Sequence, residues 1–466
     1  MGSVTLDIDS YLHFILKQDA TKPVPTVDPP LTYVEYAKVH LGKIVQIIAL
    51  IPAPTQPRPI LTSFIDNTCS DIDLPYDAES ITTIISTPYR QAKYLAAQSR
   101  FLAEDIREGE HRNYGPEDFV PYVLAKDSVS RGGASGTVTK VEFVKDGSAV
   151  FARKELHLGI REESDGEWGG YQMELRNLAG LNHPHLVKLR CSYTQNHKAY
   201  IIMSPYAPLS LLDFLKKPDG CPFYNTATIV QRKEMLLGWM SCLASGMVYL
   251  HDSFMKHMDV KPDNILLHVT SSSYPSPLLT GFGISKKFTL SQGSHSLAQS
   301  GTEFWQAPEH MRKRKAGRAA DVFALGGIFM LLLAVSHGNS TQSIINALQP
   351  NVEYHIPGFA ANLERVVLPY IAQVSSSAAS KAAWDLVREM LSPDVEVRPT
   401  ARDVWKTMKG ILEEGGFDNH CATLPPTPQS SLETLKGDNG DGDIGDTASI
   451  LARLRLEREK NSSSLW

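Results

Sequence analysis

The chain contains few cysteines, and no two of them are spaced as a metal-binding or redox pair. The five, none of them in a Cys-x-x-Cys arrangement, are Cys69, Cys191, Cys221, Cys242 and Cys421. This scarcity argues against a disulfide framework and against a cysteine-based zinc site, and it favours a reducing compartment. We therefore expect an intracellular protein, either cytoplasmic or nuclear.

The sequence also lacks a strong charge imbalance and a long apolar segment. The formal net charge is −5, which gives no reason to expect a nucleic acid or an anionic membrane as partner. The longest apolar run, Val322 to Val335, is too short to span a bilayer. No secretory signal opens the chain, and Leu6 stands where a myristoylation motif that begins at Gly2 needs Ser or Thr. These absences predict neither membrane nor nucleic-acid binding, and they leave the oligomeric state open.

One short polar loop carries three chemically distinct groups. Asp259, Lys261 and Asn264 stand at positions 1, 3 and 6 of this loop. The strand-like apolar pair Leu266-Leu267 follows at once. Phosphoryl transfer needs a carboxylate that orients the attacking hydroxyl, a cation near the moving phosphate and a metal ligand. The loop therefore predicts phosphoryl-transfer chemistry.

A glycine-rich turn and a hairpin pattern precede this loop in the chain. Thr137 to Phe143 alternates apolar and polar residues, Asp146-Gly147 is typical of a hairpin turn, and Ala149 to Leu156 begins a second strand. Glycines in such a turn let the backbone approach phosphate groups. The residues that mark the turn are Gly133, Gly136 and Val138.

Together these stretches resemble the eukaryotic protein kinase family, in its serine/threonine branch. The glycine-rich turn matches the end of G-x-G-x-x-G-x-V, although Arg131 holds the first glycine place. Phe151-Ala152-Arg153-Lys154 is similar to the kinase V-A-I-K strand. Glu309 with Arg398, and Asp321 at the start of a buried helix, match later landmarks. The pairs Lys261-Pro262 and Gly301-Thr302 are those of the serine/threonine branch.

The resemblance covers roughly residues 120–415 and implies an α+β, two-lobed protein kinase fold. A small β-rich N-lobe is expected at about 120–206, and a large helical C-lobe at about 207–415. Residues 1–119 then form a helical N-terminal extension of unknown role. Residues 416–466 form a mostly disordered tail, rich in Pro, Ser, Gly and Asp, with a possible short helix at 447–460.

The resemblance also implies catalytic roles. The chain would bind ATP with Mg²⁺ or Mn²⁺ and transfer the γ-phosphate to a serine or threonine of a protein substrate. Asp259 would orient the attacking hydroxyl, Lys261 would stabilise the moving phosphate, and Thr302 would brace both. Asn264 would be a metal ligand.

Nucleotide contacts follow from the same resemblance. Lys154 would hold the α- and β-phosphates and would itself be held by Glu174, on the helix that comes next. Met203 would stand at the entrance of the hinge between the lobes. The remaining contacts are expected from Gly133, Gly136, Val138, Ala152 and Tyr206.

Two departures from the family pattern bear on activity. The strand that should end in D-F-G reads Gly281-Phe282-Gly283, so the metal-binding aspartate is missing. A metal is worth several kcal/mol of charge stabilisation, and each ~1.4 kcal/mol is a factor of ten in rate. A loss of two to four orders of magnitude is expected unless another carboxylate, Asp263 or Glu303, substitutes. The second departure is Met258, which stands where the family often has an arginine that reads activation-segment phosphorylation.

Three functional interpretations remain open. The first is a working serine/threonine kinase with a weakened metal site. The second is a pseudokinase, a nucleotide-binding or scaffolding module that signals by docking on a partner. The third is a structural protein in which the kinase fold presents the N-terminal helices. The retained active-site residues favour the first two, and Gly281→Asp should raise the transfer rate if the rest of the site is preorganised.

The N-terminal extension is predicted to contain two amphipathic helices. The first begins at the capping-box residue Thr32 and runs to Ile48 along one apolar face. Four prolines between Pro52 and Pro59 end it and favour an extended linker. The second begins at Thr87-Pro88 and ends near Gly109.

Overall fold

The computed structural model describes residues 7–424, except for 26, 52–55, 104, 117, 134–135, 145, 158–164, 270–273, 288–295, 298–302, 313–314, 349–357, 375–380, 420 and 422. The predicted helix at 447–460 and the predicted bracing residue Thr302 lie outside the described residues. The chain divides into two compact units. Residues 1–107, 112–129 and 140–151 form the first unit, and 108–111, 130–139 and 152–466 form the second.

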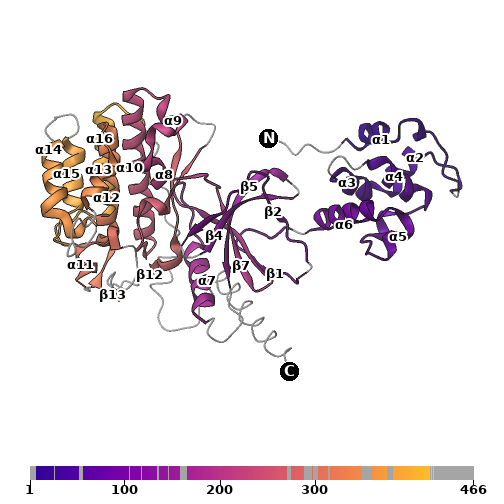
Figure 1. The fold of residues 1–466 in the computed structure, drawn as a ribbon, viewed down its shortest axis with the longest axis horizontal. Coiled ribbons are helices and arrows are strands. Elements are labelled where there is room, and N and C mark those ends of the chain that lie inside the picture. The colour runs from indigo at the N-terminus through magenta and orange to yellow at the C-terminus, as the bar shows by residue number, and fades with distance from the viewer. Residues whose placement is uncertain are drawn as a thin grey trace. The chain divides into compact units, whose positions relative to one another are not determined.

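The N-terminal part of the first unit is helical and has a core of its own (Figure 1). Its buried residues run from Leu12 to Ala97 and include Tyr33, Phe64 and Tyr94, whose side chains are fully buried. The helices are α1 (Ile8–Leu16), α2 (Tyr33–His40), α3 (Gly42–Ala49), α4 (Pro57–Asp66), α5 (Ser80–Ile84) and α6 (Pro88–Leu102). The predicted start of the second helix at Pro88 is confirmed, although that helix ends at Leu102.

The single helix expected from Thr32 to Ile48 is wrong, because the structure has two. The capping box of Thr32 and Glu35 starts α2 as predicted. The backbone then leaves the helical region at Leu41, where φ is −121° and ψ is 24°. The carboxylate of Asp71 accepts hydrogen bonds from the backbone N–H groups of Lys43 (2.7 Å) and Ile44 (2.9 Å). A distant side chain therefore caps the start of α3, so the helix begins anew there.

The extended linker expected across the prolines is also wrong in its second half. Helix α4 begins at Pro57 and includes Pro59. Proline has no N–H group and a fixed φ, both of which suit the first turn of a helix, where that N–H has no partner anyway. The prolines therefore start a helix where a linker was expected.

The N-lobe is built on a seven-stranded sheet. Its strand order is β1-β6-β7-β5-β4-β2, with β3 paired to β4. Gly132 pairs with Thr137 across the glycine-rich hairpin, and Ala152 pairs with Met203 across β5 and β7. The strands are β1 (His111–Asn113), β2 (Tyr122–Leu124), β3 (Arg131–Gly133), β4 (Gly136–Phe143), β5 (Asp146–His157), β6 (Lys188–Gln195) and β7 (Lys198–Ser204). Asp146 and Gly147, predicted to form the hairpin turn, are the first two residues of strand β5.

Helix α7 (Asp165–Leu178) packs against this sheet through β6. Leu175 and Leu178 are buried and belong to the large core of the second unit, while Met173 is partly exposed. Helix α7 packs on β6 and on the short turn Phe282–Ile284. That contact joins the helix to the glycine-containing segment that departs from the family pattern.

The C-lobe is a helical bundle around two long helices, α10 (Ile229–Asp252) and α12 (Arg318–Ser336) (Figure 1). They pack on each other, α16 (Ala401–Glu414) packs on α10, and α15 (Lys381–Met390) packs on α12. The remaining described helices of the C-lobe are α8 (Leu211–Lys216), α9 (Pro222–Asn225), α11 (Pro308–Met311), α13 (Thr341–Leu348) and α14 (Leu368–Val374).

Short strands connect the C-lobe helices and carry the polar loop. Strand β10 pairs with both β11 and β8, β9 pairs with β12, and β13 pairs with β14. These strands are β8 (Leu209–Ser210), β9 (Met255–Lys256), β10 (Ile265–His268), β11 (Ser276–Leu279), β12 (Lys286–Lys287), β13 (Ser296–Leu297) and β14 (Lys315–Ala316). The polar loop therefore lies between β9 and β10.

Within the described residues, one helix, α12, is long and apolar enough to cross a membrane. However, 89% of its apolar window is buried inside the fold, and its flanks pack on α10 and α15. This is the environment of a core helix.

Candidate active site

The polar loop is organised around the carboxylate of Asp259. The Nζ atom of Lys261 lies 2.7 Å from Oδ2 of Asp259. The side-chain amide of Asn264 donates to the same Oδ2 (2.9 Å) and to the backbone oxygen of Asp259 (2.8 Å). The structure therefore brings together the three residues that the sequence singled out, and two donors fix the orientation of the carboxylate.

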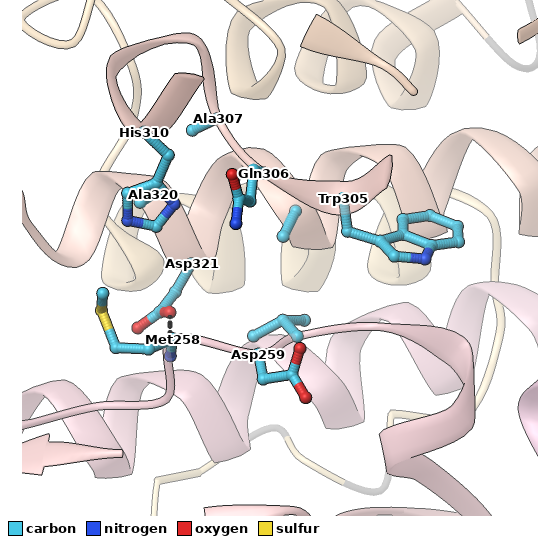
Figure 2. Close-up of a pocket in the computed structure, with 10 residues that line it drawn as sticks. Met258, Asp259, Trp305, Gln306, Ala307, His310, Ala320 and Asp321 are labelled. Carbon is cyan, nitrogen blue, oxygen red and sulfur yellow. Dashed lines mark hydrogen bonds between the residues drawn. The ribbon is translucent and has the colours of Figure 1, made fainter. Parts of the chain in front are cut away.

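A buried aspartate accepts hydrogen bonds from the backbone of this loop. Asp321, at the start of α12, accepts hydrogen bonds from the backbone N–H groups of His257 (2.9 Å) and Met258 (2.8 Å). His251 donates a third one to it, over 3.0 Å. Burial alone would raise the pKa of Asp321, but the hydrogen bonds from His251 and from the backbone N–H of Met258 hold it below its usual value. Figure 2 shows this carboxylate next to the backbone of Met258, with the hydrogen bond between them drawn as a dashed line.

His257 joins the loop to the strand that follows it in the fold. Its Nδ1 accepts from the backbone N–H of Asp259 (3.3 Å), so Nε2 carries the proton and donates to the backbone oxygen of Thr280 (2.8 Å). Burial lowers the pKa of His257, which keeps this neutral form. The ring also packs on Phe282, with 5.2 Å between the ring centroids.

A second pair of charged residues lies in the N-lobe. The Nζ atom of Lys154 lies 2.7 Å and 2.6 Å from the two carboxylate oxygens of Glu174. Both side chains are at least nine-tenths buried. The expected pairing of these two residues is therefore present, and the ammonium group of Lys154 is fixed in position by the helix α7.

The segment Gly281-Phe282-Gly283 lies next to both groups of charged residues. Gly281 has φ of +85°, and a Cβ atom there would lie 2.5 Å from Cγ of Asn264. A Cβ atom on Gly283 would lie 3.4 Å from Oε2 of Glu174. Phe282 itself is buried. The segment thus lies between the Asp259 loop and the Lys154–Glu174 pair.

Asn177 fixes this segment and was not singled out from the sequence. Its side-chain amide donates to the backbone oxygens of Phe282 (2.8 Å) and Ser285 (2.8 Å). Asn177 follows Glu174 by three residues, so the two side chains share one face of α7. The signal in the sequence was this pair of polar residues on a helix face that is otherwise apolar.

The nucleotide residues expected from the sequence take defined places in the N-lobe. Gly136 has φ of +133°, and a Cβ atom there would lie 2.3 Å from the backbone oxygen of Glu155, so only glycine fits. Ala152 and Met203 are buried, and Val138 packs against the same core. The backbone oxygen of Tyr206 accepts from Nδ1 of His268 (3.0 Å). Gly133 ends β3, opposite Gly136.

The donor set for a divalent cation is incomplete. Asn264 supplies an amide oxygen, but position 281 supplies no carboxylate, and Oδ2 of Asp259 already accepts from Lys261 and Asn264. Mg²⁺ prefers carboxylate and phosphate oxygens. Asp263 and Glu303, the nearest carboxylates in the sequence, are both exposed. The residues present therefore do not fit the family's usual pair of metal ions.

A small pocket of about 10 Å³ adjoins the loop at Asp259 and has room for about one water molecule. Asp259, Trp305, His310 and Asp321 are among its lining residues (Figure 2). The Nε2 atom of His310 is buried and has no hydrogen-bond partner among the described residues. Next to it, Glu309 binds Arg398 through two hydrogen bonds of 2.7 Å, so the expected landmark pair is also present.

A family model for the protein kinase domain matches residues 131–408. The chain belongs to the protein kinase family. A calcium/calmodulin-dependent protein kinase type 1 from Macrobrachium nipponense is 24% identical over 285 residues, which cover 60% of this chain and 72% of that protein. The two-lobed fold that the sequence predicted is therefore confirmed.

Two plant relatives match a smaller share of their own length. An L-type lectin-domain containing receptor kinase VI.2 from Arabidopsis thaliana is 27% identical over 282 residues, 55% of this chain and 38% of that protein. A serine/threonine-protein kinase, AtPK2/AtPK19, from the same plant is 26% identical over 249 residues, 52% of this chain and 48% of that protein. The chain thus spans less than half the length of each of these two plant relatives.

Proposed function

We propose that this kinase domain binds ATP and transfers its γ-phosphate slowly to serine or threonine residues of a protein substrate. The observation that carries the proposal is the arrangement around Asp259. Its carboxylate is oriented by Lys261 and Asn264, and the loop backbone is held by Asp321. Such positioning is most of what phosphoryl transfer asks of a protein.

The pair Lys154–Glu174 supports nucleotide binding. A buried lysine that is neutralised by one carboxylate remains a strong donor toward phosphate oxygens. The constraint on Gly136 supports the same assignment, because a glycine-rich hairpin without side chains lets backbone N–H groups approach phosphates. Ala152 and Met203, facing each other on β5 and β7, would supply apolar walls for the base.

The incomplete metal site supports a low rate. We derive no step through a metal ion, because position 281 offers no carboxylate. Asp259 would orient the substrate hydroxyl, and Lys261 would offset charge on the phosphate as it moves. The loss of several kcal/mol of metal stabilisation corresponds to a rate two to four orders of magnitude below that of a complete site, at ~1.4 kcal/mol per tenfold.

The test is phosphotransfer from radiolabelled ATP to a generic basic protein, in Mg²⁺ and in Mn²⁺, with Asp259→Asn as the matched control. This substitution keeps the size of the side chain and removes its charge. Slow transfer by the parent chain that disappears in the control is the expected result. Equal incorporation in both proteins would trace the signal to a contaminating kinase and contradict the proposal.

The second candidate is a pseudokinase that binds a nucleotide or a partner without transfer. It is favoured by the backbone at Gly281, which has a positive φ and lies against Asn264, and so has no room for the missing aspartate. Binding of a fluorescent ATP analogue with and without Mg²⁺ separates the two. Metal-independent binding that Lys154→Met abolishes, together with no transfer, would assign the chain to this second class.

A further inference from the structure

Three ligand-type side chains that are far apart in the sequence meet in the C-lobe. They are His185, before β6, Cys242, on α10, and Cys421, after α16. Their ligand atoms all lie within 4.8 Å of one another, and all three residues are buried. The Cys421 Sγ atom lies 2.8 Å from Nε2 of His185 and 3.5 Å from Sγ of Cys242. The cysteine spacing in the sequence argued against a zinc site, but the fold assembles the residues in space.

We propose that His185, Cys242 and Cys421 form a binding site for a single Zn²⁺ ion. Two thiolates and one imidazole are the ligands that Zn²⁺ prefers, and a buried site with three protein ligands leaves a fourth position for water or a hydroxyl. Ser245 lies one turn after Cys242 on α10, so its hydroxyl is on the same side of that helix. This site is separate from the Asp259 loop, and the proposal does not depend on phosphotransfer.

The imidazole of His185 is already oriented for this role. Its Nδ1 atom lies 3.0 Å from the backbone oxygen of Pro277, which can only accept, so Nδ1 carries the proton. Nε2 is then the unprotonated nitrogen, and its lone pair points at the sulfur of Cys421. A ring N–H donated to a backbone carbonyl is the usual outer contact of a zinc-binding histidine.

The sulfur geometry is close to that of a tetrahedral ion. Bonds of about 2.3 Å to sulfur and about 2.0 Å to nitrogen place ligand atoms roughly 3.5–3.8 Å apart. The two sulfurs, at 3.5 Å, already have this separation. The nitrogen–sulfur distance of 2.8 Å must lengthen by roughly 0.7 Å, which a small rotation of the Cys421 side chain can supply.

The charge at the site also suits a cation. Binding of Zn²⁺ displaces the thiol protons of Cys242 and Cys421 into solvent and forms two Zn–S bonds and one Zn–N bond, with no change of oxidation state. Two thiolates then balance the charge of the ion inside the core.

The site would fasten the segment after α16 to the body of the C-lobe. Cys421 is tied there by its backbone oxygen, which accepts from Nε1 of Trp405 (2.9 Å), and by its N–H group, which donates to Asn419 (3.0 Å). A metal bond from Cys421 to α10 and to the chain before β6 adds links between three distant parts of the sequence. Metal binding is therefore expected to stabilise the folded chain.

The experiment is a titration of the full, reduced chain with Co²⁺, a coloured substitute for Zn²⁺, under anaerobic conditions. One equivalent should produce a thiolate-to-cobalt charge-transfer band that one equivalent of Zn²⁺ removes. Cys421→Ser should lose most of this band and bind Zn²⁺ at least tenfold more weakly. Cys221→Ser, which changes another buried cysteine, is the matched control and should behave as the parent chain does.

A second readout uses the parent chain alone, in case Cys421→Ser does not fold. Bound Zn²⁺ should slow alkylation of Cys242 and Cys421, mapped by peptide mass spectrometry, and leave the rates at Cys69, Cys191 and Cys221 unchanged. The proposal is overturned if the folded parent chain gives no charge-transfer band. It is equally overturned if Cys421→Ser keeps the full band, or if Zn²⁺ protects all five cysteines alike. The trio would then be a hydrogen-bonded thiol–imidazole cluster.

Discussion

The backbone of Gly281 lies so close to the side chain of Asn264 that no room remains for a Cβ atom at position 281. A Cβ atom on Gly281 would lie 2.5 Å from Cγ of Asn264, and the φ of +85° is one that side chains rarely adopt. Both the backbone conformation at position 281 and the neighbouring side chain of Asn264 therefore disfavour an aspartate there. The site is not a complete kinase site that lacks one side chain, because its surroundings have no room for that side chain.

The first prediction concerns Gly281→Asp. A preorganised site would gain activity from this change, but the strained backbone and the contact with Asn264 predict otherwise. We expect the free energy of unfolding to fall by about 1–3 kcal/mol, the usual cost of a non-glycine residue in such a conformation, with no gain in transfer rate. Chemical denaturation and the phosphotransfer assay measure the two effects.

Gly283→Ala is the control for that experiment. A Cβ atom there would make an ordinary contact of 3.4 Å with Glu174, so a loss below about 1 kcal/mol is expected. If Gly281→Asp were as stable as the parent chain and transferred phosphate faster, the segment would have to adopt a second backbone conformation that accepts the aspartate.

The second prediction concerns the buried pair of Lys154 and Glu174. Lys154→Met leaves a buried carboxylate without its partner, which costs about 3–5 kcal/mol, and it should abolish ATP binding. The double variant Lys154→Met/Glu174→Leu replaces the whole pair by apolar groups. It should regain most of the stability and none of the ATP binding, as measured by denaturation and by a fluorescent nucleotide.

Lys198→Met is the matched control, because Lys198 pairs with Glu155 on neighbouring strands of the same sheet but is partly exposed. A loss below about 1 kcal/mol and unchanged ATP binding are expected. ATP binding that persists in the double variant would show that Lys154 does not hold the nucleotide.

The third prediction concerns Asp321→Asn. The amide turns one acceptor into a donor that faces the backbone N–H groups of the loop, so at least one buried hydrogen bond is lost. A fall of about 2–4 kcal/mol in the free energy of unfolding is expected. Asp385→Asn, at a more exposed position paired with Arg388, should cost less than about 1 kcal/mol. Equal losses for the two variants would refute the supporting role of Asp321.

The fourth prediction is a pH dependence that comes from His310. Burial lowers the pKa of this histidine below its ordinary value, so the folded chain binds the proton less well than the unfolded chain does. The charged groups that act on the ring electrostatically are Glu309 and Asp321, which raise its pKa, and Lys256 and Arg398, which lower it. Stability from the neutral ring is therefore present above about pH 6.5 and is lost as the pH falls, by at most about 1.4 kcal/mol per pH unit.

His310→Leu tests this dependence. The variant should gain stability relative to the parent chain between pH 7.5 and pH 5.5, measured by urea denaturation at each pH. His157→Gln, at an exposed position, should follow the parent chain at every pH. A difference between His310→Leu and the parent that stays constant with pH would exclude proton binding at His310 as its cause.

The kinase motifs could be found in the sequence because their residues act within short segments. Asp259, Lys261 and Asn264 lie in one loop, and the backbone of that loop alone brings them together. The partner of Lys154 was also predictable, because Glu174 occupies a fixed place on the next helix. Such local constraints can be recognised from the order and spacing of residues.

Long-range contacts could not be read in the same way. Asp71 caps α3 from 28 residues further along the chain, and nothing in the run from Thr32 to Ile48 signals that the helix will restart. The contact of Asn264 with position 281 depends on how two loops fold against each other. The meeting of His185, Cys242 and Cys421 depends on the packing of three separate elements. In each case the deciding interaction is a tertiary contact, which the local sequence pattern does not predict.

The contacts of Phe282 also bear on how small molecules could act on this kinase domain. Its ring is buried against His257, and Asn177 donates hydrogen bonds to the backbone oxygens of Phe282 itself and of Ser285, three residues later. An inhibitor that requires this ring to leave its place must break two hydrogen bonds, at roughly 1 kcal/mol each, and expose a buried Phe, at roughly 1.5–3 kcal/mol. Compounds that leave the ring where it is avoid this penalty. The contacts of Phe282 should therefore favour inhibitors that leave its ring in place over inhibitors that displace it.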